Sequence, residues 1–322
     1  MSGWVLFDSF RLVNNSKASN IIQNPLFILK HSYKVNIYCG STRLISSLIF
    51  HFLGQLNCLI RYLRSNITKI DYPMLENLDI TNVLFLDIET VSNQPDFEAL
   101  PDEFKDLWAI KSKQILRKYD EGLEEGEAKA LYSEKAGIYA EFGKIVCISV
   151  GIVVRDTATN RLIVRLKSYA DDDEAKLLTD FSELLNQYYN NPTKHYFCGH
   201  NIREFDIPYI CRRLLINQLP LTKLLDIGGK KPWETKYMLD TMELWKFGDY
   251  KNYTALKLLM AVFGLPSPKD DIDGSQVGRV YWEDKDLDRI ARYCEKDVLA
   301  VVQLLLKYMR LPVLEGEQIV HV

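Results

Sequence analysis

The 322-residue chain lacks a long uninterrupted apolar run, and it contains few cysteines. Its most apolar stretch, residues 44–60, is interrupted by Ser, His, Gly, Gln and Asn, whereas a membrane span needs roughly 20 predominantly apolar residues. The six cysteines are scattered and include no C-x-x-C pair, which favours reduced thiols over a disulfide framework or a zinc site. We therefore expect no membrane partner and a cytoplasmic location.

Glutamate is absent from the first 73 residues, which contain eight Lys/Arg and two Asp. Residues 74–322 carry 32 Lys/Arg against 41 Asp/Glu, so the sign of the charge changes near Met74. The chain also begins without the basic segment, apolar core and cleavage site of a signal peptide. We expect residues 1–73 to be an N-terminal extension: translated upstream sequence with Met74 as the physiological start, a poorly ordered segment or an organellar presequence. Residues 74–322 would then form the folded domain.

The chain has no strong net charge either, because its formal value is −3. A field this weak neither indicates nor excludes a nucleic acid partner. Local basic runs such as Arg212/Arg213 exist, and we expect them to be solvated faces of helices or loops.

From residue 74 onward, strand-like and helix-like segments alternate. Apolar runs predict strands at 83–88, 144–154 and 161–170, and the last two form a hairpin. Two charged helices are expected in an insert at about 96–140, after the first strand. Further segments read as short strands within 194–201 and 235–240, and as helices at 171–189, 206–219, 252–265 and 286–309. This alternation predicts a mixed α/β sheet covered by helices.

The first strand ends in two carboxylates one residue apart, Asp87 and Glu89. Side chains at i and i+2 of a strand point to the same face, so both acids aim together while Leu86 and Ile88 face the opposite side. Like charges at this spacing repel each other unless a cation lies between them, and paired carboxylates suit Mg²⁺ or Mn²⁺. By itself, the pair is more typical of a solvated strand end.

Two further motifs lie in later helices. Asn201, Phe205 and Asp206 form an N-x-x-x-F-D pattern in "GHNIREFDIPYICRR", where Asp206 could also serve as a capping or first-turn acid. In "YCEKDV", Tyr293 and Asp297 are four residues apart, which places them one turn apart on one helix face. Taken singly, that pair is more typical of a core tyrosine beside an exposed acid.

The order of these motifs carries more information than any one of them. A strand D-x-E, then N-x-x-x-F-D opening a helix, then Y-x-x-x-D in a late helix resembles the DEDD superfamily of 3′–5′ exonucleases, in the subgroup with Tyr in the last motif. "GHNIREFDIPYICRRL" and "RYCEKDVLAVVQLL" are similar to the proofreading exonuclease domains of family B DNA polymerases. "SPKDDIDGSQV" and the overall length resemble stand-alone bacterial proteins predicted to be related exonucleases. The resemblance covers about residues 81–310.

The resemblance implies a ribonuclease H-like fold, with a five-stranded mixed sheet that includes one antiparallel strand. It implies that two Mg²⁺ or Mn²⁺ ions are held by Asp87, Glu89, Asp206 and Asp297. Tyr293 would act with them as a catalytic residue that orients or deprotonates the attacking water. The implied substrate-binding residues are Thr90, Asn201 and Phe205. The insert at 96–140 is expected to form a wall or lid over the substrate cleft.

The function implied by the resemblance is hydrolysis of the 3′-terminal phosphodiester of DNA, at single-stranded or frayed ends, with release of nucleoside 5′-monophosphates. The expected partners are therefore nucleic acid 3′ ends, and DNA is favoured over RNA; DNA repair is the expected role. Two alternatives stay open at this point. The same acids could trim RNA 3′ ends, or the chain could be a catalytically idle nucleic-acid binding module.

Overall fold

A computed structural model of the protein describes residues 75–120, 122–124, 126–249, 251, 253–266 and 271–322. The expectations for residues 1–73 lie outside the described residues. At the centre is a six-stranded sheet in the order β5-β4-β1-β2-β3-β6. The strands are β1 (Val83–Ser92), β2 (Gly143–Arg155), β3 (Leu162–Ala170), β4 (Tyr196–Gly199), β5 (Met238–Asp240) and β6 (Ile319–His321).

The strand directions are those of the expected ribonuclease H-like fold. β2 is antiparallel to β1 and β3, while β4 is parallel to β1, β5 to β4, and β6 to β3. A single strand, β2, therefore runs against the other five. The expected number of five strands was wrong by one: the three-residue β6 adds to the edge at β3, and so short a run carries no recognisable alternation.

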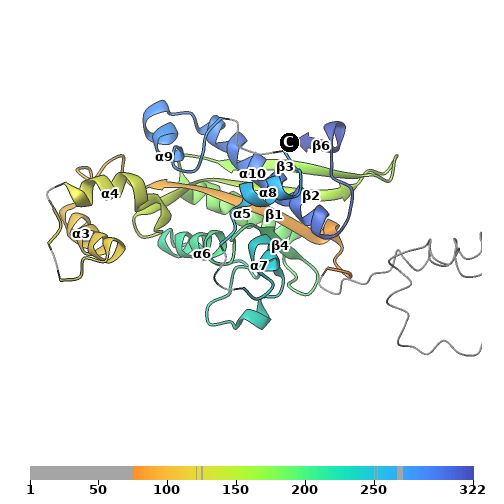
Figure 1. Ribbon diagram of the computed structural model, residues 1–322, viewed down its shortest axis with the longest axis horizontal. Coiled ribbons are helices and arrows are strands. Elements are labelled where there is room, and N and C mark those ends of the chain that lie inside the picture. The colour runs from red at the N-terminus through yellow and green to blue at the C-terminus, as the bar shows by residue number, and fades with distance from the viewer. Residues whose placement is uncertain (1–74, 121, 125, 250, 252, 267–270) are drawn as a thin grey trace, which may run out of the picture. The chain divides into compact units, whose positions relative to one another are not determined.

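Helices cover both faces of the sheet (Figure 1). α5 (Glu174–Tyr188) and α6 (Asp206–Ile216) bury their apolar stripes in one hydrophobic cluster with Leu84, Leu86 and Ile88 of β1. α10 (Leu287–Tyr308) packs on the opposite face, against Phe85. The period-two pattern of β1 thus separates two apolar layers, and the predicted opposite facing of Leu86 and Ile88 is confirmed.

The insert after β1 contains the two expected helices, α3 (Asp102–Leu116) and α4 (Glu127–Lys135), followed by a 3₁₀ turn at Ala136–Ile138. It has its own small core, in which the fully buried Trp108 packs edge-on to Tyr132, with ring centroids 5.3 Å apart. Figure 1 shows α3 and α4 beyond the end of the sheet at which β1 finishes.

The remaining helices among the described residues are short. They are α7 (Thr241–Lys246), α8 (Leu256–Val262), α9 (Val277–Arg279) and a π-helix at Val280–Asp284, with 3₁₀ turns at Ile80–Asn82, Pro232–Glu234 and Gly316–Gln318. α8 is shorter than the helix expected at 252–265. Within the part of the chain that the structure describes, no helix is long and apolar enough to cross a membrane.

A buried ion pair fastens α5 to α6. Arg213 bonds Glu174 through its Nε and Nη2 atoms, at 2.8 and 2.5 Å, and Glu174 also accepts the backbone N–H of Ile145 in β2 at 2.7 Å. Both side chains are buried. The expectation of a solvated face at Arg213 was therefore wrong, because this arginine points inward to a carboxylate that lies 39 residues away in the sequence, whereas Arg212 is exposed.

Candidate active site

Asp87 and Glu89 project from β1 on the face covered by α10, opposite the cluster that holds Leu86 and Ile88. Glu89 is buried and Asp87 is partly buried. The pairing with β2 shifts immediately after Glu89, so that Val146 is left without a partner in the register. Such bulges bend a strand and re-aim its side chains. The irregularity lies directly beside the two predicted acids.

Asp206 reaches the same place from another element. It is the first residue of α6 and is buried, and its Oδ1 accepts the backbone N–H of Ile88 at 3.2 Å. The register of β4 with β1 ends at Phe85↔Cys198, so the N–H of Ile88 lies beyond the last strand pair. A buried N–H needs an acceptor, and the Asp206 carboxylate supplies it, which brings this acid next to the chain segment that carries Asp87.

Tyr293 and Asp297 come from α10, one turn apart, and a hydrogen bond joins their side chains. Tyr293 is buried and Asp297 is partly buried. α10 packs on β1, so this turn of the helix faces the D-x-E acids. Three elements that are far apart in the sequence, β1, the start of α6 and one turn of α10, thus bring the five predicted catalytic residues together.

The electrostatics of the cluster follow from burial and like charge. Burial raises the pKa of Asp87 well above its usual range, and the neighbouring Asp206, Glu89 and Asp297 raise it further. Burial also raises the pKa of Asp206 to about 7, against the opposing pull of the N–H groups that it accepts. The pKa of Tyr293 is raised by burial and then by Asp297 and Glu89. Four ionised carboxylates at this site therefore require positive charge from elsewhere.

The donor set fits a divalent cation. A carboxylate oxygen of Asp87, one of Glu89 and the Sγ of Cys294 all lie within 4.8 Å of one another. Carboxylate oxygens are the ligands that Mg²⁺ and Mn²⁺ prefer, and the like charges of Asp206, Glu89 and Asp297 around the partly buried Asp87 favour a bound cation there. An acidic cluster able to hold a divalent metal is therefore present.

Cys294 is the neighbour that the sequence did not reveal. Its thiol donates to the main-chain oxygen of Asp87 at 3.4 Å and lies 3.6 Å from Asp87 Oδ2. It is buried and lies between Tyr293 and Asp297 on α10. Cys294 is three residues before Asp297 and therefore on the same helix face. This spacing was the feature of the sequence that could have indicated its proximity to the acids. The contact orients the Asp87 carboxylate.

The predicted substrate-binding residues are not all in one place. Thr90 and Phe205 line the cleft described next, although Thr90 also makes a side-chain hydrogen bond with Tyr209 and Phe205 packs on the same tyrosine, with ring centroids 5.5 Å apart. Asn201 does not line that cleft. It adopts a left-handed backbone (φ 68°), and its N–H donates to Asp240 Oδ1 at 2.9 Å. Its Oδ1 is buried without a hydrogen-bond partner among the described residues.

A cleft of about 730 Å³ adjoins the cluster, and Glu89 is the member of the cluster that lines it. One wall is the end of β1, including Glu89; the second is the end of the insert, with Glu134 and Ile138; the third is the segment 274–283. Gly137 lets the insert approach closely, because a Cβ there would lie 3.1 Å from the backbone of Val91. The expected wall beside the site is thus formed by the end of the insert.

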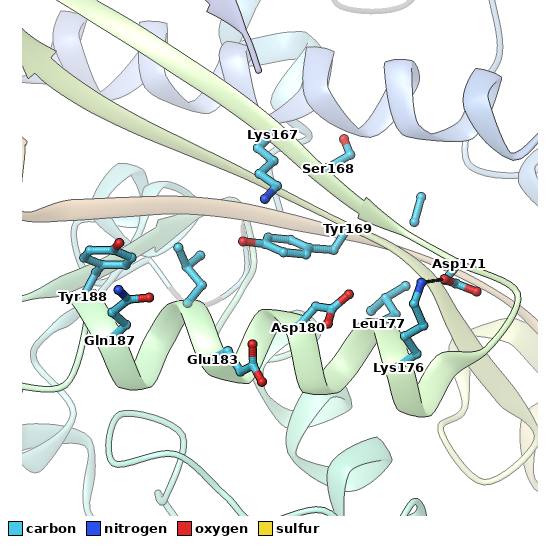
Figure 2. A pocket seen from close by; sticks show the side chains of 12 residues that line it. Lys167, Ser168, Tyr169, Asp171, Lys176, Leu177, Asp180, Glu183, Gln187 and Tyr188 are labelled. Atoms are coloured by element: carbon cyan, nitrogen blue, oxygen red, sulfur yellow. Dashed lines mark hydrogen bonds and ion pairs between the residues drawn. The ribbon is translucent and has the colours of Figure 1, made fainter.

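A second groove lies elsewhere, between β3 and α5 (Figure 2). Its lining carries charges of both signs, and Lys176 forms an ion pair with Asp171 at one end. None of the residues predicted for the site lines it. This groove is therefore separate from the acidic cluster and does not contribute to it.

Comparison with known proteins places these features in a family context. Residues 138–318, more than half of the chain, match a family described as predicted 3′–5′ exonucleases related to the exonuclease domain of PolB. The match contains Asp206, Tyr293 and Asp297 but begins after Asp87 and Glu89.

Among solved structures, the chain is similar to the family B DNA polymerase of the hyperthermophilic archaeon Pyrobaculum calidifontis. The two are 15% identical, with a TM-score of 0.41, over 71% of this chain and 24% of the polymerase chain. This chain thus spans about a quarter of the length of that polymerase. No curated protein gives a significant match.

Proposed function

Because the chain belongs to the family of predicted 3′–5′ exonucleases related to the exonuclease domain of PolB, we propose that it hydrolyses the 3′-terminal phosphodiester of DNA in a metal-dependent reaction. The observation that carries this proposal is the clustering of four acids, in which Asp206, Glu89 and Asp297 all act on the partly buried Asp87 and Glu89 also lines the cleft. Asp206 and Asp297 lie within the matched residues, and the proximity of Asp87 and Glu89 to them supports including these two earlier acids in the proposed site.

The metal would be held by Asp87, Glu89, Asp206 and Asp297. Two Mg²⁺ or Mn²⁺ ions bound there would supply an activated water and charge stabilisation at the leaving oxygen. This fits the raised pKa of Asp87, since carboxylates that repel one another gain most from added positive charge. Cys294 would assist by keeping the Asp87 carboxylate in place.

The chain's own groups would orient the reaction. Tyr293, hydrogen-bonded to Asp297, would hold the attacking water with its hydroxyl. Its raised pKa favours the neutral phenol, which suits orientation of the water better than removal of its proton. Oxygen from water forms a new bond to phosphorus, the bond to the 3′-oxygen breaks, and that oxygen takes up a proton. The products are a nucleoside 5′-monophosphate and a strand that is one nucleotide shorter.

Substrate contacts would come from the cleft. Phe205 lines it and offers a ring on which a base can stack, and Thr90 could donate to the terminal 3′-oxygen. Asn201 would act from a greater distance, by shaping the turn before α6, because it does not line the cleft. A cytoplasmic location and a role in DNA repair stay predictions.

The test is degradation of 5′-labelled single-stranded DNA, duplex DNA and RNA, each with Mg²⁺, with Mn²⁺ and with a chelator. We expect a ladder that shortens from the 3′ end, fastest on single-stranded DNA, and that disappears in chelator. Faster trimming of RNA would instead support an exoribonuclease, which uses the same acids. Binding without shortening under all conditions would contradict the proposal and support an idle binding module.

A further inference from the structure

The cleft beside the carboxylates has an unusual charge for a surface that would receive a polyanion. Its lining contains four acidic residues, Glu89, Asp96, Glu134 and Glu283. Among the described residues that line it, Arg279 alone carries a positive charge. A phosphodiester strand entering this cleft would be repelled by most of its walls. Metal ions would offset the charge near Glu89, whereas among the described lining residues Arg279 supplies the positive charge of the protein itself.

Arg279 lies within the wall formed by the segment 274–283, which is firmly attached to the sheet. It precedes the π-helix Val280–Asp284, a form that often marks functional positions. Trp282 in this helix donates from Nε1 to the main-chain oxygen and the Oγ of Ser92, at 3.2 and 3.1 Å. Ser92 is the last residue of β1. The wall is thereby tied to the same strand that carries Asp87 and Glu89.

A second set of contacts holds the adjoining residue. The hydroxyl of Tyr281 donates to Asp172 Oδ1 at 2.7 Å and accepts from Lys144 Nζ at 2.8 Å. Lys144 also lies over the rings of Tyr281 and Trp282, 4.8 and 5.4 Å from their centroids. These contacts, which involve β2 and the loop after β3, leave the wall little freedom. Arg279 is therefore presented to the cleft from a rigid support.

The guanidinium of Arg279 is available to a ligand. Its side chain is about half exposed, and its ion pair with Asp284 spans 3.6 Å, longer than a hydrogen bond. Exposed pairs of this kind contribute little free energy, so exchange of this carboxylate for a phosphate costs little. The planar guanidinium matches two phosphate oxygens at once.

We infer that Arg279 binds a backbone phosphate of the substrate strand, upstream of the scissile bond, and is the residue that admits a polyanion to an otherwise acidic cleft. This inference rests on the proposed function. Arg279 would act by positioning the strand, because it comes from the segment 274–283 and not from β1, α6 or the turn of α10 that carry the clustered acids. Its contact would be the same in the ground state and the transition state, so its loss should raise KM and leave kcat unchanged.

The test compares Arg279→Ala, Arg279→Glu and the matched control Arg212→Ala, which removes an exposed arginine of α6 that does not line the cleft. Binding is measured by fluorescence anisotropy with Mg²⁺ and a 5′-fluorescein-labelled single-stranded DNA whose terminal linkages are hydrolysis-resistant phosphorothioates. We expect Arg279→Ala to weaken binding about tenfold. Arg279→Glu should weaken binding more, and Arg212→Ala should change it by less than about twofold.

The salt dependence separates a direct phosphate contact from a general structural effect. Loss of one contact should reduce the slope of log affinity against log salt by about 0.7 for a single strand. The inference is overturned if Arg279→Ala and Arg279→Glu bind with the affinity and salt slope of the wild type. If instead the wild-type protein shortens no strand with Mg²⁺ or Mn²⁺, the proposed function fails, which is a different result.

Discussion

At the scale of single residues, the site is defined by carboxylates that repel one another. Burial and three neighbouring acids raise the pKa of Asp87, and Asp206 is fixed by the N–H of Ile88. These positions are unfavourable for a folded protein without cations, and they are suited to holding cations. Neutral substitutions of these acids should therefore lower the activity without lowering the stability of the metal-free protein.

Asp87→Asn and Asp297→Asn should each reduce exonuclease activity at least about 100-fold, because each removes a charged metal ligand. In chelator, neither variant should unfold at a lower temperature than the wild type, since a neutral amide relieves the repulsion that raises the pKa of Asp87. Strand shortening and thermal unfolding measure the two effects. Glu183→Gln on the exposed face of α5 is the control. An Asp87→Asn protein that shortens DNA at the wild-type rate would refute the assignment.

The pKa of Asp206 predicts a pH dependence for the metal-free protein. This pKa rises from 3.8 to about 7 on folding, so the folded state binds the proton more tightly than the unfolded state. The free energy of unfolding should then fall as the pH rises from 3.8 to about 7, and it should level off above this pH window. We expect a loss on the order of 2–4 kcal/mol from this group.

Urea denaturation in chelator across this pH window measures the loss. Asp206→Asn should remove this part of the pH dependence, because the amide does not titrate. An unchanged pH dependence in Asp206→Asn would show that Asp206 does not titrate as described. Added Mg²⁺ should stabilise the wild type more above the window than below it, where protons compete for the carboxylates.

At the scale of elements, three segments position the acids: β1, the start of α6 and one turn of α10. α6 is held in place by the Arg213–Glu174 pair, which also joins α5 and β2. Arg213 further donates to the main-chain oxygen of Ala140 at 2.8 Å, at the end of the insert. This network links the helix that carries Asp206 to the wall of the cleft.

Glu174→Ala should lower the free energy of unfolding by about 3–5 kcal/mol, because it leaves the Arg213 guanidinium buried without its counter-charge. Glu183→Ala, in an exposed position of the same helix, should change it by less than about 0.5 kcal/mol. Urea denaturation of both variants provides the comparison. If Glu174→Ala and Glu183→Ala were equally stable, the buried ion pair would contribute no more to the free energy of unfolding than an exposed acid does.

At the scale of the whole molecule, residues 75–322 contain hydrophobic clusters on both faces of the sheet and all the residues assigned to the site. We propose that 74–322 is the exonuclease domain. The chain 74–322, expressed without residues 1–73, should therefore fold cooperatively and shorten DNA at the rate of the full chain. Thermal unfolding and the strand-shortening assay test this, and an aggregated or inactive chain would contradict it. Intact-mass measurement of the native protein would show whether it begins at Met74.

Much of the site followed from local spacing. The period of a strand places Asp87 and Glu89 on one face, and the period of a helix places Tyr293 one turn from Asp297. Both relations involve a few consecutive residues, so they hold in almost any tertiary context. The interleaving of strands and helices, the early hairpin and the two helices of the insert were predictable for the same reason.

Only the tertiary structure decided the contacts between distant segments. The hydrogen bond from Ile88 to Asp206 spans 118 residues, the inward turn of Arg213 depends on Glu174 in another helix, and Cys294 acquires its role from its distance to Asp87. The three residues of β6 form a strand because they pair with the edge strand β3. Residue spacing determines which side chains share a face, whereas packing determines which faces meet. The position of Arg279 in the acidic cleft, where it is the one cation among the described lining residues, was decided by packing.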